Sequence, residues 1–561
     1  MATEQDLMER IVSLAKRRGF IFPSSEIYGG INGFWDYGPL GVALKRNIKE
    51  AWWHDVVRCP PPGPDAAPIE MVGLDCSIIM NPKVWEASGH LGGFADPMVT
   101  CKDCKRHMRS DQLSMCIIGE VPRIPDQVFD TQMQAIEALN PEPTSEGFMV
   151  GPARGPTFGQ SVGSDTPTFL VADGVSVEEM QAGLRRRIGS KRAKVVSRGA
   201  ARFAEDGGKC YFLEFGYNAD WTRLNSPDAR CPHCGGELTE PRSFNLMLPT
   251  NIGAMEDSSS RAYLRPETAQ GIFANYMNVL DTSRVKVPFG IAQIGKAFRN
   301  EINPRNYTFR SREFEQMEIE FFCHPNDADT WYEYWRDSRF QWYVDHGLKS
   351  DKLRLRNHEQ DELAHYAVSC ADVEYAFPFG TSELEGVANR TDFDLKQHQE
   401  ASGRDMTYFD DQTKERFIPY VIEPSGGVDR AALAFLCEAY DEDEAPDEKG
   451  KMQRRTVLRF HPRFAPVKVA VFPLVRKDGM PEKAREIYMA CREQVSAFYD
   501  EKGAVGRRYR RQDEAGTPFC VTVDGQTAED GTVTIRDRDT MVQERIPSDD
   551  VAAYVRERLR L

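Results

Sequence analysis

The sequence predicts an α+β protein in which a domain containing an antiparallel hairpin is followed by a smaller α/β domain. Apolar runs at 285–298 and 314–322 flank a loop with turn residues at 303–306, which predicts the hairpin. Strand, helix and strand patterns at 467–472, 481–499 and 519–523 predict a parallel sheet, and a final helix is expected at 548–561.

The composition is that of a multidomain globular protein. The chain has 561 residues, of which 41% are apolar and 28% are charged, so three or four domains are expected. No apolar run approaches the roughly 20 residues of a membrane span, and the acidic, amphipathic start does not resemble a signal peptide. We therefore expect a cytoplasmic protein without a membrane partner. Thirteen cysteines, an odd number, favour free thiols with one metal site over a disulfide framework.

The net charge of −15 argues against a nucleic-acid partner, but the basic residues are clustered. A run at 181–204 has no acidic residue and contains eight basic ones: Arg185, Arg186, Arg187, Lys191, Arg192, Lys194, Arg198 and Arg202. A second cluster, Arg507-Arg508-Tyr509-Arg510-Arg511, has a composition suited to RNA, because bases can stack on Tyr509 or on guanidinium planes. The alternative for each cluster is a solvated charged face.

An amphipathic helix is expected at 40–53. Its apolar positions 40, 44, 48 and 52 have helical spacing and follow a Gly-Pro turn. The pattern fits either a core helix or a subunit interface.

Two cysteine pairs form a candidate zinc site. Cys101 and Cys104, with Cys231 and Cys234, offer four thiolates, which would close a tetrahedral, purely structural coordination sphere. The pairs are unusually far apart, so we expect the Pro/Gly-rich stretch 117–225 to be a small inserted domain. The alternative is two unligated cysteine pairs on the surface.

Two arginine-bearing regions predict a nucleotide site. Phe298-Arg299-Asn300-Glu301 and Phe309-Arg310-Ser311-Arg312-Glu313-Phe314 lie at the hairpin, and Glu423-Pro424-Ser425-Gly426-Gly427-Val428-Asp429-Arg430 follows much later. Guanidinium groups bind phosphate oxygens bidentately and can stack on a purine, which suits a triphosphate.

These segments resemble motifs 2 and 3 of the class II aminoacyl-tRNA synthetases. Leu264-Arg265-Pro266-Glu267-Thr268-Ala269-Gln270-Gly271, Glu318-Ile319-Glu320 and the segment at 423 are similar to the dimeric glycyl-tRNA synthetases. The resemblance extends from Gly33-Phe34-Trp35-Asp36-Tyr37-Gly38-Pro39-Leu40-Gly41 to Gly516-Thr517-Pro518-Phe519, with no counterpart identified for 117–225. It implies an antiparallel sheet flanked by helices.

The resemblance also implies a division into domains and a function. We expect a catalytic domain in two parts (1–116 and 226–462), an insertion (117–225) that contacts the tRNA acceptor end, and an anticodon-binding domain (463–561). The implied enzyme is a glycine–tRNA ligase that forms glycyl-adenylate and pyrophosphate from glycine and ATP, then transfers glycyl to tRNA(Gly). The helix at 40–53 corresponds to motif 1, which implies a homodimer.

The family's catalytic roles can be assigned to three arginines. Arg299 is expected to contact the α-phosphate and the glycine carboxylate, Arg310 the γ-phosphate, and Arg430 the triphosphate and one purine face. No general base is required, because the attacking carboxylate is already ionised at neutral pH. The expected ATP-binding set is Arg299, Asn300, Glu301, Phe309, Arg310, Ser311, Arg312, Glu313, Phe314, Glu383, Leu384, Gly427, Val428, Asp429 and Arg430. Glu301 is expected to contact adenine and Phe314 to stack on it.

Glycine has no side chain to bind, so its selection must rely on exclusion. Glu267, Glu318 and Glu423 match the family's ammonium-binding positions, and Ser425 matches the residue that closes the space beside the α-carbon. The expected glycine-binding set is Arg109, Glu267, Phe314, Glu315, Gln316, Met317, Glu318, Glu423, Pro424, Ser425, Gly426 and Gly427.

Magnesium is expected on the ATP phosphates, and Glu383 matches the family's acidic position near them. Glu385 is two residues further on and is expected to share a strand face with Glu383, which leaves a joint metal role open. The alternative is that these carboxylates only brace the arginines.

Two other classes of function compete with this assignment. A synthetase for threonine, proline or histidine would not fill its pocket with Glu267, Glu318, Glu423 and Ser425. A non-catalytic paralogue that binds nucleic acid would be expected to lose the ATP arginines, and Arg299, Arg310 and Arg430 are all present.

Overall fold

The structure is a computed structural model that describes residues 4–64, 66, 68–109, 113–118, 148–152, 212–215, 238–240, 242–254, 260–360, 362–364, 366–446 and 452–559. The chain forms two compact units, one made of residues 1–90 and 247–561 and the other of residues 91–246. The second unit includes more residues at both ends than the predicted insertion 117–225. In the described parts of the chain, no helix has the length and apolar character needed to cross a bilayer.

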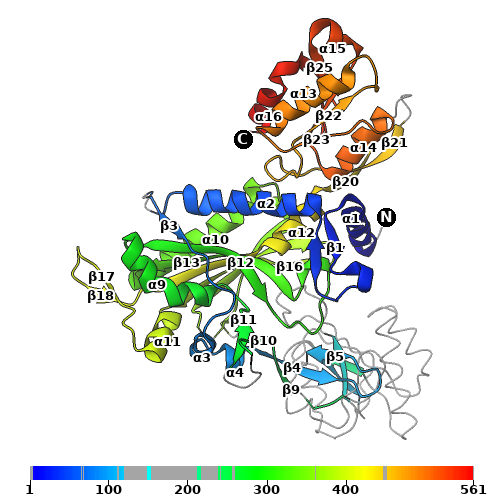
Figure 1. Cartoon of the computed structure of the whole chain (residues 1–561). Helices are drawn as coiled ribbons and strands as arrows, with labels where there is room; N and C mark the ends of the chain where they lie inside the picture. The colour runs from blue at the N-terminus through cyan, green and yellow to red at the C-terminus, as the bar shows by residue number, and fades with distance from the viewer. Residues whose placement is uncertain are drawn as a thin grey trace, which may run out of the picture. The chain divides into compact units, whose positions relative to one another are not determined.

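A seven-stranded sheet forms the centre of the first unit (Figure 1). All neighbouring strands are antiparallel except the pair β12 and β3, which is parallel. The order is β14 (Leu353–Asn357), β15 (Ser369–Phe377), β16 (Gly380–Thr391), β19 (Tyr420–Gly427), β13 (Glu313–Cys323), β12 (Phe289–Phe298) and β3 (Glu70–Gly73). The expected antiparallel sheet flanked by helices is therefore confirmed.

The predicted hairpin consists of β12 and β13. Phe289 pairs with Phe322 at one end and Phe298 with Glu313 at the other, so the register is regular along ten residue pairs. The loop between the strands contains the 3₁₀ turn η4 (Tyr307–Phe309) and a backbone bridge between Arg305 and Arg310. This loop brings the predicted motif 2 arginines to the end of the sheet.

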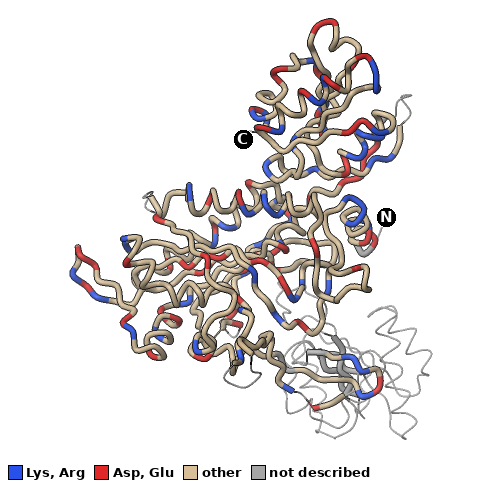
Figure 2. Tube along the Cα trace, in the orientation of Figure 1, with Lys and Arg blue, Asp and Glu red and all other residues tan. Residues whose placement is uncertain are grey.

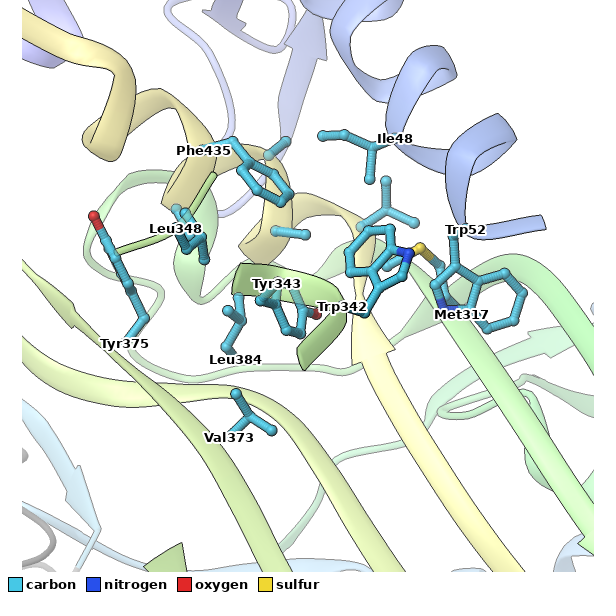
Figure 3. Close-up of a cluster of buried hydrophobic side chains, with 14 of the residues drawn as sticks. Ile48, Trp52, Met317, Trp342, Tyr343, Leu348, Val373, Tyr375, Leu384 and Phe435 are labelled. Atoms are coloured by element: carbon cyan, nitrogen blue, oxygen red, sulfur yellow. The ribbon is translucent and has the colours of Figure 1, made fainter. Parts of the chain in front are cut away.

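Helices cover both faces of the sheet. On one face α1 (Glu4–Arg18), α2 (Pro39–Trp53), α10 (Ala328–Asp345) and α12 (Val428–Ala439) bury the main core, part of which Figure 3 shows. Met317 and Ile319 of β13 belong to this core. On the other face α9 (Ala269–Ser283) and α11 (Phe393–Ser402) pack on Phe289, Ile291 and Phe322. Alternate residues of β13 therefore point to different surroundings.

The helix α2 extends over the predicted range and buries its apolar stripe in the core of the first unit. Leu44, Ile48 and Trp52 are buried in the main core, whereas Val42 on the outer side is 55% exposed. The stripe thus has the core role that the sequence left open, and any subunit contact of α2 must use its outer side.

Short strand pairs complete the first unit. They are β1 (Ile21–Pro23) with β2 (Trp35–Tyr37), β10 (Leu248–Asn251) with β11 (Arg261–Leu264), β17 (Tyr408–Phe409) with β18 (Arg416–Phe417), and β20 (Tyr440–Pro446) with β21 (Met452–Leu458). The short helix α3 (Pro82–Ala87) precedes the second unit, and α4 (His90–Gly93) spans the sequence boundary at which that unit begins.

The C-terminal region has its own five-stranded sheet. Its order is β23 (Ala497–Tyr499), β22 (Val469–Pro473), β24 (Phe519–Val523), β25 (Thr532–Asp537) and β26 (Gln543–Pro547), with helices α13 (Met480–Arg492), α14 (Val505–Ala515), α15 (Gly525–Asp530) and α16 (Val551–Leu559). The predicted parallel pairing holds for β22 with β23 and β24. The helix predicted over 481–499 ends at Arg492, because Ala497–Tyr499 pairs with β22 as a strand.

The structure contradicts RNA stacking on Tyr509. Its ring packs edge-on against Phe472, its hydroxyl lies 2.6 Å from Thr522 Oγ1, and burial raises its pKa to about 12. Arg508 is also buried and donates to the Pro473 carbonyl at 2.6 Å. These side chains lie on the face of α14 that packs on the sheet. Only the residues of this cluster on the outer face of α14 remain candidates for a contact with RNA. Figure 2 shows basic and acidic residues interspersed along the described chain.

The second unit contains two small antiparallel sheets in its described part. One has the order β5 (His107–Arg109), β4 (Ala95–Thr100) and β9 (Arg242–Asn245), and the other β7 (Phe148–Pro152), β6 (Leu113–Ile118) and β8 (Phe212–Phe215). Arg109 ends β5. The basic run at 181–204 lies outside the described residues.

Candidate active site

A pocket of about 340 Å³ opens at the end of the large sheet. Its walls come from β13, β16 and β19 and from the loop that joins β12 to β13. Most of the predicted catalytic and substrate-binding side chains line it together: Glu267, Arg299, Glu301, Phe309, Arg310, Ser311, Phe314, Gln316, Glu318, Glu383, Glu423, Ser425, Gly426, Gly427, Asp429 and Arg430.

One end of the pocket is built around Glu318, which is buried on β13. Ser425 on the neighbouring strand β19 donates its hydroxyl to Glu318 Oε1 at 2.8 Å, and the Thr268 hydroxyl donates to Oε2. Gln316 Nε2 donates to Ser425 Oγ at 3.2 Å. These bonds fix both oxygens of Glu318 and the side chain that the sequence placed beside the substrate α-carbon.

Glu423 is held by a buried arginine that the sequence did not single out. Arg390 Nη1 lies 2.9 Å from both carboxylate oxygens of Glu423, and the same guanidinium bonds both oxygens of Asp394 at 2.7 and 2.9 Å. The Arg390 guanidinium also stacks 4.0 Å from the Tyr366 ring centroid. One arginine therefore orients Glu423 towards the pocket and is itself fixed on two sides.

Glu267 completes the group of carboxylates from the loop before α9. Its Oε1 is 3.4 Å from His90 Nε2 and accepts from Gln270 Nε2 at 3.2 Å. Burial alone would raise the pKa of Glu267, but His90, Arg390 and Arg299 outweigh it and hold the pKa well below its usual range. Glu267 is therefore ionised at neutral pH.

The pKa values of Glu318 and Glu423 are shifted in the opposite direction, upwards. Burial, followed by the charge of Glu267, raises the pKa of Glu318 above its ordinary value. Burial also raises the pKa of Glu423 to about 8, even though Arg390 opposes this shift. Several carboxylates in a low-dielectric site repel each other. A cationic ligand bound at this end of the pocket would reduce that repulsion.

The other end of the pocket is rich in arginine and more exposed. Arg299 donates to the Pro266 carbonyl at 3.1 Å, and its guanidinium lies 5.4 Å from the Phe314 ring centroid. Arg430 lies 4.7 Å from the Phe309 ring centroid and forms a 3.1 Å ion pair with Glu383. Fixed cations beside aromatic rings suit an anionic ligand with a planar base.

A buried network connects the start of α12 with α2. Asp429 Oδ1 accepts from Tyr37 at 2.6 Å and from Lys45 at 2.8 Å, and Asp429 Oδ2 accepts from the Glu315 backbone amide at 2.7 Å. Arg430 follows Asp429 directly, so these bonds also fix the backbone that presents the motif 3 arginine.

Several predicted side chains do not reach the pocket. Successive residues of a strand point to opposite faces. Glu315 consequently forms ion pairs with Lys45 and Lys49, and Met317 lies in the main core. The other predicted residues whose side chains do not line the pocket are Asn300, Arg312, Glu313, Leu384, Pro424 and Val428.

The expectation that Glu383 and Glu385 share a strand face is wrong. Leu384 forms a bulge, since Glu374 pairs with Glu383 while the preceding Val373 pairs with Glu385. Glu383 lines the pocket, whereas Glu385 is buried on the other face, where it bonds Arg339 at 2.6 Å and Tyr343 at 2.8 Å. A metal role shared by the two carboxylates is therefore excluded by geometry.

Comparison with known proteins identifies the family. Residues 254–502 match the tRNA synthetase class II core domain (G, H, P, S and T), and residues 468–558 match an anticodon binding domain. The glycine–tRNA ligase of Rhodopirellula baltica is 50% identical, and the alignment covers 99% of each chain. Those of Thermobifida fusca and Ruminiclostridium cellulolyticum are 44% and 46% identical over at least 98% of each chain.

The chain belongs to the glycine–tRNA ligase family. The predicted class II core, anticodon-binding domain and aminoacyl-tRNA synthetase activity are thereby confirmed. The matches cover almost the whole chain and so span the stretch 117–225, for which the sequence motifs identified no counterpart.

The structure adds residues to this glycine–tRNA ligase site that sequence reasoning missed. Arg390 is the most important, and Thr268, Tyr366 and His358 also contact or line the pocket. The short interval between Arg390 and Asp394 is a detectable signal, because an i, i+4 pair of opposite charges can bond across a helix start. Nothing in the sequence indicates that this pair reaches Glu423.

Two groups of side chains could hold a metal. His358, Cys370 and Asp372 each place one donor atom within 4.8 Å of the others at the pocket wall. In the second unit, Cys104 donates its backbone amide to Cys101 Sγ at 3.4 Å, as in a metal-binding knuckle. Cys101 bridges to the backbone of Leu238, four residues beyond Cys234, whereas Cys231 and Cys234 lie outside the described residues.

Proposed function

We propose that this chain joins glycine to ATP, releasing pyrophosphate, and then transfers glycyl from the adenylate to the 3′ end of tRNA(Gly). The observation that carries this proposal is the convergence of Glu267, Glu318 and Glu423 with Ser425 at one end of the arginine-rich pocket. The names of the related ligases support the choice of amino acid.

Three carboxylates can surround an ammonium group, and this explains the preference for glycine. Glu318 is fixed by Thr268 and Ser425, and Glu423 is fixed by Arg390, so neither can move aside easily. A side chain on the α-carbon would meet Ser425 or separate buried charges from their partners. Small size is thus selected by a rigid, charged enclosure. Arg109 lies in the second unit, and its role towards glycine remains a prediction.

Arg299 is the residue proposed to bring the two substrates together. It lines the pocket, and its charge acts on Glu267 at one end and on Glu383 at the other, so it is proposed to contact both the glycine carboxylate and the α-phosphate. The carboxylate attacks phosphorus in line with the leaving pyrophosphate, and the fixed guanidinium stabilises the charge that develops. The attacking group needs no base, since it is already ionised.

Arg310 and Arg430 are proposed to hold the rest of ATP. Arg310 would contact the γ-phosphate, Arg430 would bind phosphate and one face of adenine, and Phe314 would stack on the other face. Glu301 lines the same end and is the proposed contact for the adenine amino group. The positions of Phe314 and Arg430 in one pocket support this arrangement.

Glu383 is the proposed protein ligand for magnesium on the ATP phosphates. The charge of Arg430 lowers its pKa, so the carboxylate is ionised, and its side chain is 47% exposed at the pocket. An accessible, ionised oxygen ligand fits magnesium, which neutralises phosphate charge when bound. The ion pair between Glu383 and Arg430 also holds the arginine in place, which is the alternative role that the sequence left open for Glu383.

We also propose a structural zinc bound by Cys101, Cys104, Cys231 and Cys234. The knuckle geometry at Cys101 and the backbone bridge to Leu238 support one site formed from both pairs. Cys101 is buried, as expected for a closed structural site. Loss of one equivalent of zinc on a Cys104→Ser substitution, measured by elemental analysis, would test it.

tRNA(Gly), a second subunit and a cytosolic location complete the proposal. The anticodon-binding domain supports the contact with tRNA. The outer side of α2 is the proposed dimer surface, testable by analytical ultracentrifugation.

The basic run at 181–204 is proposed to contact the acceptor end of tRNA. Neutralising Arg185, Arg186 and Arg187 should raise the tRNA KM and flatten its salt dependence, and unchanged values would contradict this role.

The deciding experiment is ATP–pyrophosphate exchange with each of the twenty amino acids, with magnesium and without tRNA. Exchange with glycine alone is the expected result. Exchange with another amino acid would overturn the assignment of the carboxylate pocket, and no exchange with any would overturn the proposed adenylation.

A further inference from the structure

A fully buried carboxyl group beneath the glycine end of the pocket has no assigned role. Glu320 lies on β13, two residues from Glu318 and on the same face. It is 0% exposed, and neither of its oxygens has a hydrogen-bond partner among the described residues. One oxygen each of Glu318, Glu320 and Glu423 lie within 4.8 Å of one another.

The charged groups that act on Glu320 lie on its own strand, on two other strands and on one helix. They are Glu318 on the same strand, Glu423 on β19, Arg390 on β16 and Asp394 on α11. Its partner on β12 is the apolar Ile291. Arg390 is the only cation of this group in the described part of the chain, and its guanidinium donates to Glu423 and Asp394.

An ionised Glu320 would therefore be a buried charge with no hydrogen bond and with carboxylates on two sides. Such a group takes up a proton instead, because an unpaired buried charge is far more costly than a neutral acid. Burial, followed by the charge of Glu423, raises its pKa well above the ordinary value. Glu385 shows the contrast: it is equally deep but has three bonds from Arg339 and Tyr343.

We propose that Glu320 carries a proton in the folded enzyme and that its O–H group positions Glu423 for the substrate ammonium. Rotation about the side-chain bonds brings the O–H into reach of the Glu423 oxygen, which Arg390 holds from the opposite side. Glu320 is thus a positioning residue and does not touch glycine. The positioning part rests on the proposed function, whereas the protonation does not.

The protonation is tested by thermal and chemical unfolding of Glu320→Gln between pH 6 and 9. An acid with a raised folded pKa stabilises the fold less as pH rises above its unfolded value, because the unfolded chain then releases the proton and the folded chain does not. The unfolding equilibrium constant of wild type should therefore rise by up to roughly tenfold more per pH unit than that of Glu320→Gln. Equal pH slopes would overturn the proposal.

Infrared difference spectroscopy gives an independent readout. At pH 7.5 wild type should show the carbonyl stretch of protonated carboxyl groups, and Glu320→Gln should show a weaker band, because Glu423, whose pKa is raised to about 8, contributes to it in both proteins. A band of equal intensity in both proteins would contradict protonation at Glu320. The matched control is Glu385→Gln, which removes a buried carboxylate bonded by Arg339 and Tyr343 and should destabilise the protein without weakening the band.

The positioning role is tested by comparing Glu320→Gln with Glu320→Leu. Both are neutral, but only the amide can still donate to Glu423. Glu320→Leu should raise the glycine KM at least fivefold over Glu320→Gln, with similar ATP KM and kcat values. Equal glycine KM values in the two variants would overturn the positioning role. If wild type exchanged no glycine at all, the proposed function would fail, while the unfolding and infrared results would still decide the protonation.

Discussion

The two ends of the pocket hold their charges in different ways. At the arginine-rich end, the side chains of Arg430 and Glu383 are 27% and 47% exposed. At the carboxylate end, those of Arg390 and Glu423 are 3% and 10% exposed. Water can solvate the first pair when the substrate is absent, whereas the second pair depends on fixed protein partners.

This difference separates the expected consequences of substitution. Exposed arginines cost little to keep in the empty site and contribute mainly when phosphate charge develops in the transition state. Buried carboxylates are costly unless they are paired or protonated, so changes there should alter glycine affinity, pH dependence and stability together. Four predictions examine this comparison, in order of decreasing effect.

The largest effect is expected for Arg299→Ala at the ATP end. Removing a preorganised charge beside the α-phosphate should lower the rate of adenylate formation by about 10²-fold or more. ATP–pyrophosphate exchange at saturating substrates measures it. Arg312→Ala is the matched control, because Arg312 belongs to the same loop but donates to the Glu301 and Asn32 carbonyls at 2.8 and 2.6 Å. An equal loss in both variants would show that the loop, not the charge, matters.

At the carboxylate end, Glu423→Gln should raise the glycine KM by about 30-fold while changing the ATP KM much less. A hydrogen bond between charged groups contributes about 2 kcal/mol, which corresponds to this factor. Initial rates over a matrix of glycine and ATP concentrations separate the two constants. Glu301→Gln, at the adenine end, should show the reverse pattern. If both variants raised both constants alike, the two ends would not be independent.

The sequence predicted the parts of this site that local pattern controls. The hairpin of β12 and β13 follows from two apolar runs and a turn loop, and these elements bring the motif arginines to one end of the sheet. Glu318 and Glu423 lie on adjacent strands, so their approach follows once the resemblance has assigned these strands.

The sequence could not predict features that depend on a one-residue shift in strand pairing or on contacts between residues far apart in the chain. The bulge at Leu384 reverses the side-chain alternation, so Glu383 and Glu385 point to opposite faces. Arg390 reaches Glu423 only after β16 and β19 have paired. Tyr509 lies in a basic cluster, but the packing of α14 turns its ring onto Phe472. Each of these outcomes is decided by tertiary pairing.

The pH dependence should also differ between the two ends. Since the pKa of Glu423 is raised to about 8, most of the enzyme holds a proton there at pH 7 and binds the ammonium group less well. Raising the pH from 7 to 9 should therefore increase kcat/KM for glycine by about tenfold at saturating ATP. The ATP KM should stay flat, because the pKa of Glu383 is lowered by Arg430. In Glu423→Gln the rise should disappear, and a rise that persisted would assign the titration to another group.

The smallest effect is expected for the space beside the α-carbon. Ser425→Gly removes the side chain proposed to close that space and leaves Glu318 bonded by Thr268. A pocket gains only about 1–3 kcal/mol of discrimination from one methylene-sized group, and at the lower end of this range the ratio of glycine to alanine kcat/KM should fall by about fivefold. Exchange assays with both amino acids measure this ratio. Ser425→Thr, which keeps the hydroxyl and adds a methyl group, should lower glycine activity without admitting alanine. If Ser425→Gly rejected alanine as strongly as wild type, exclusion would have to come from the rigid carboxylates alone, which would strengthen the contrast between the buried and the exposed end.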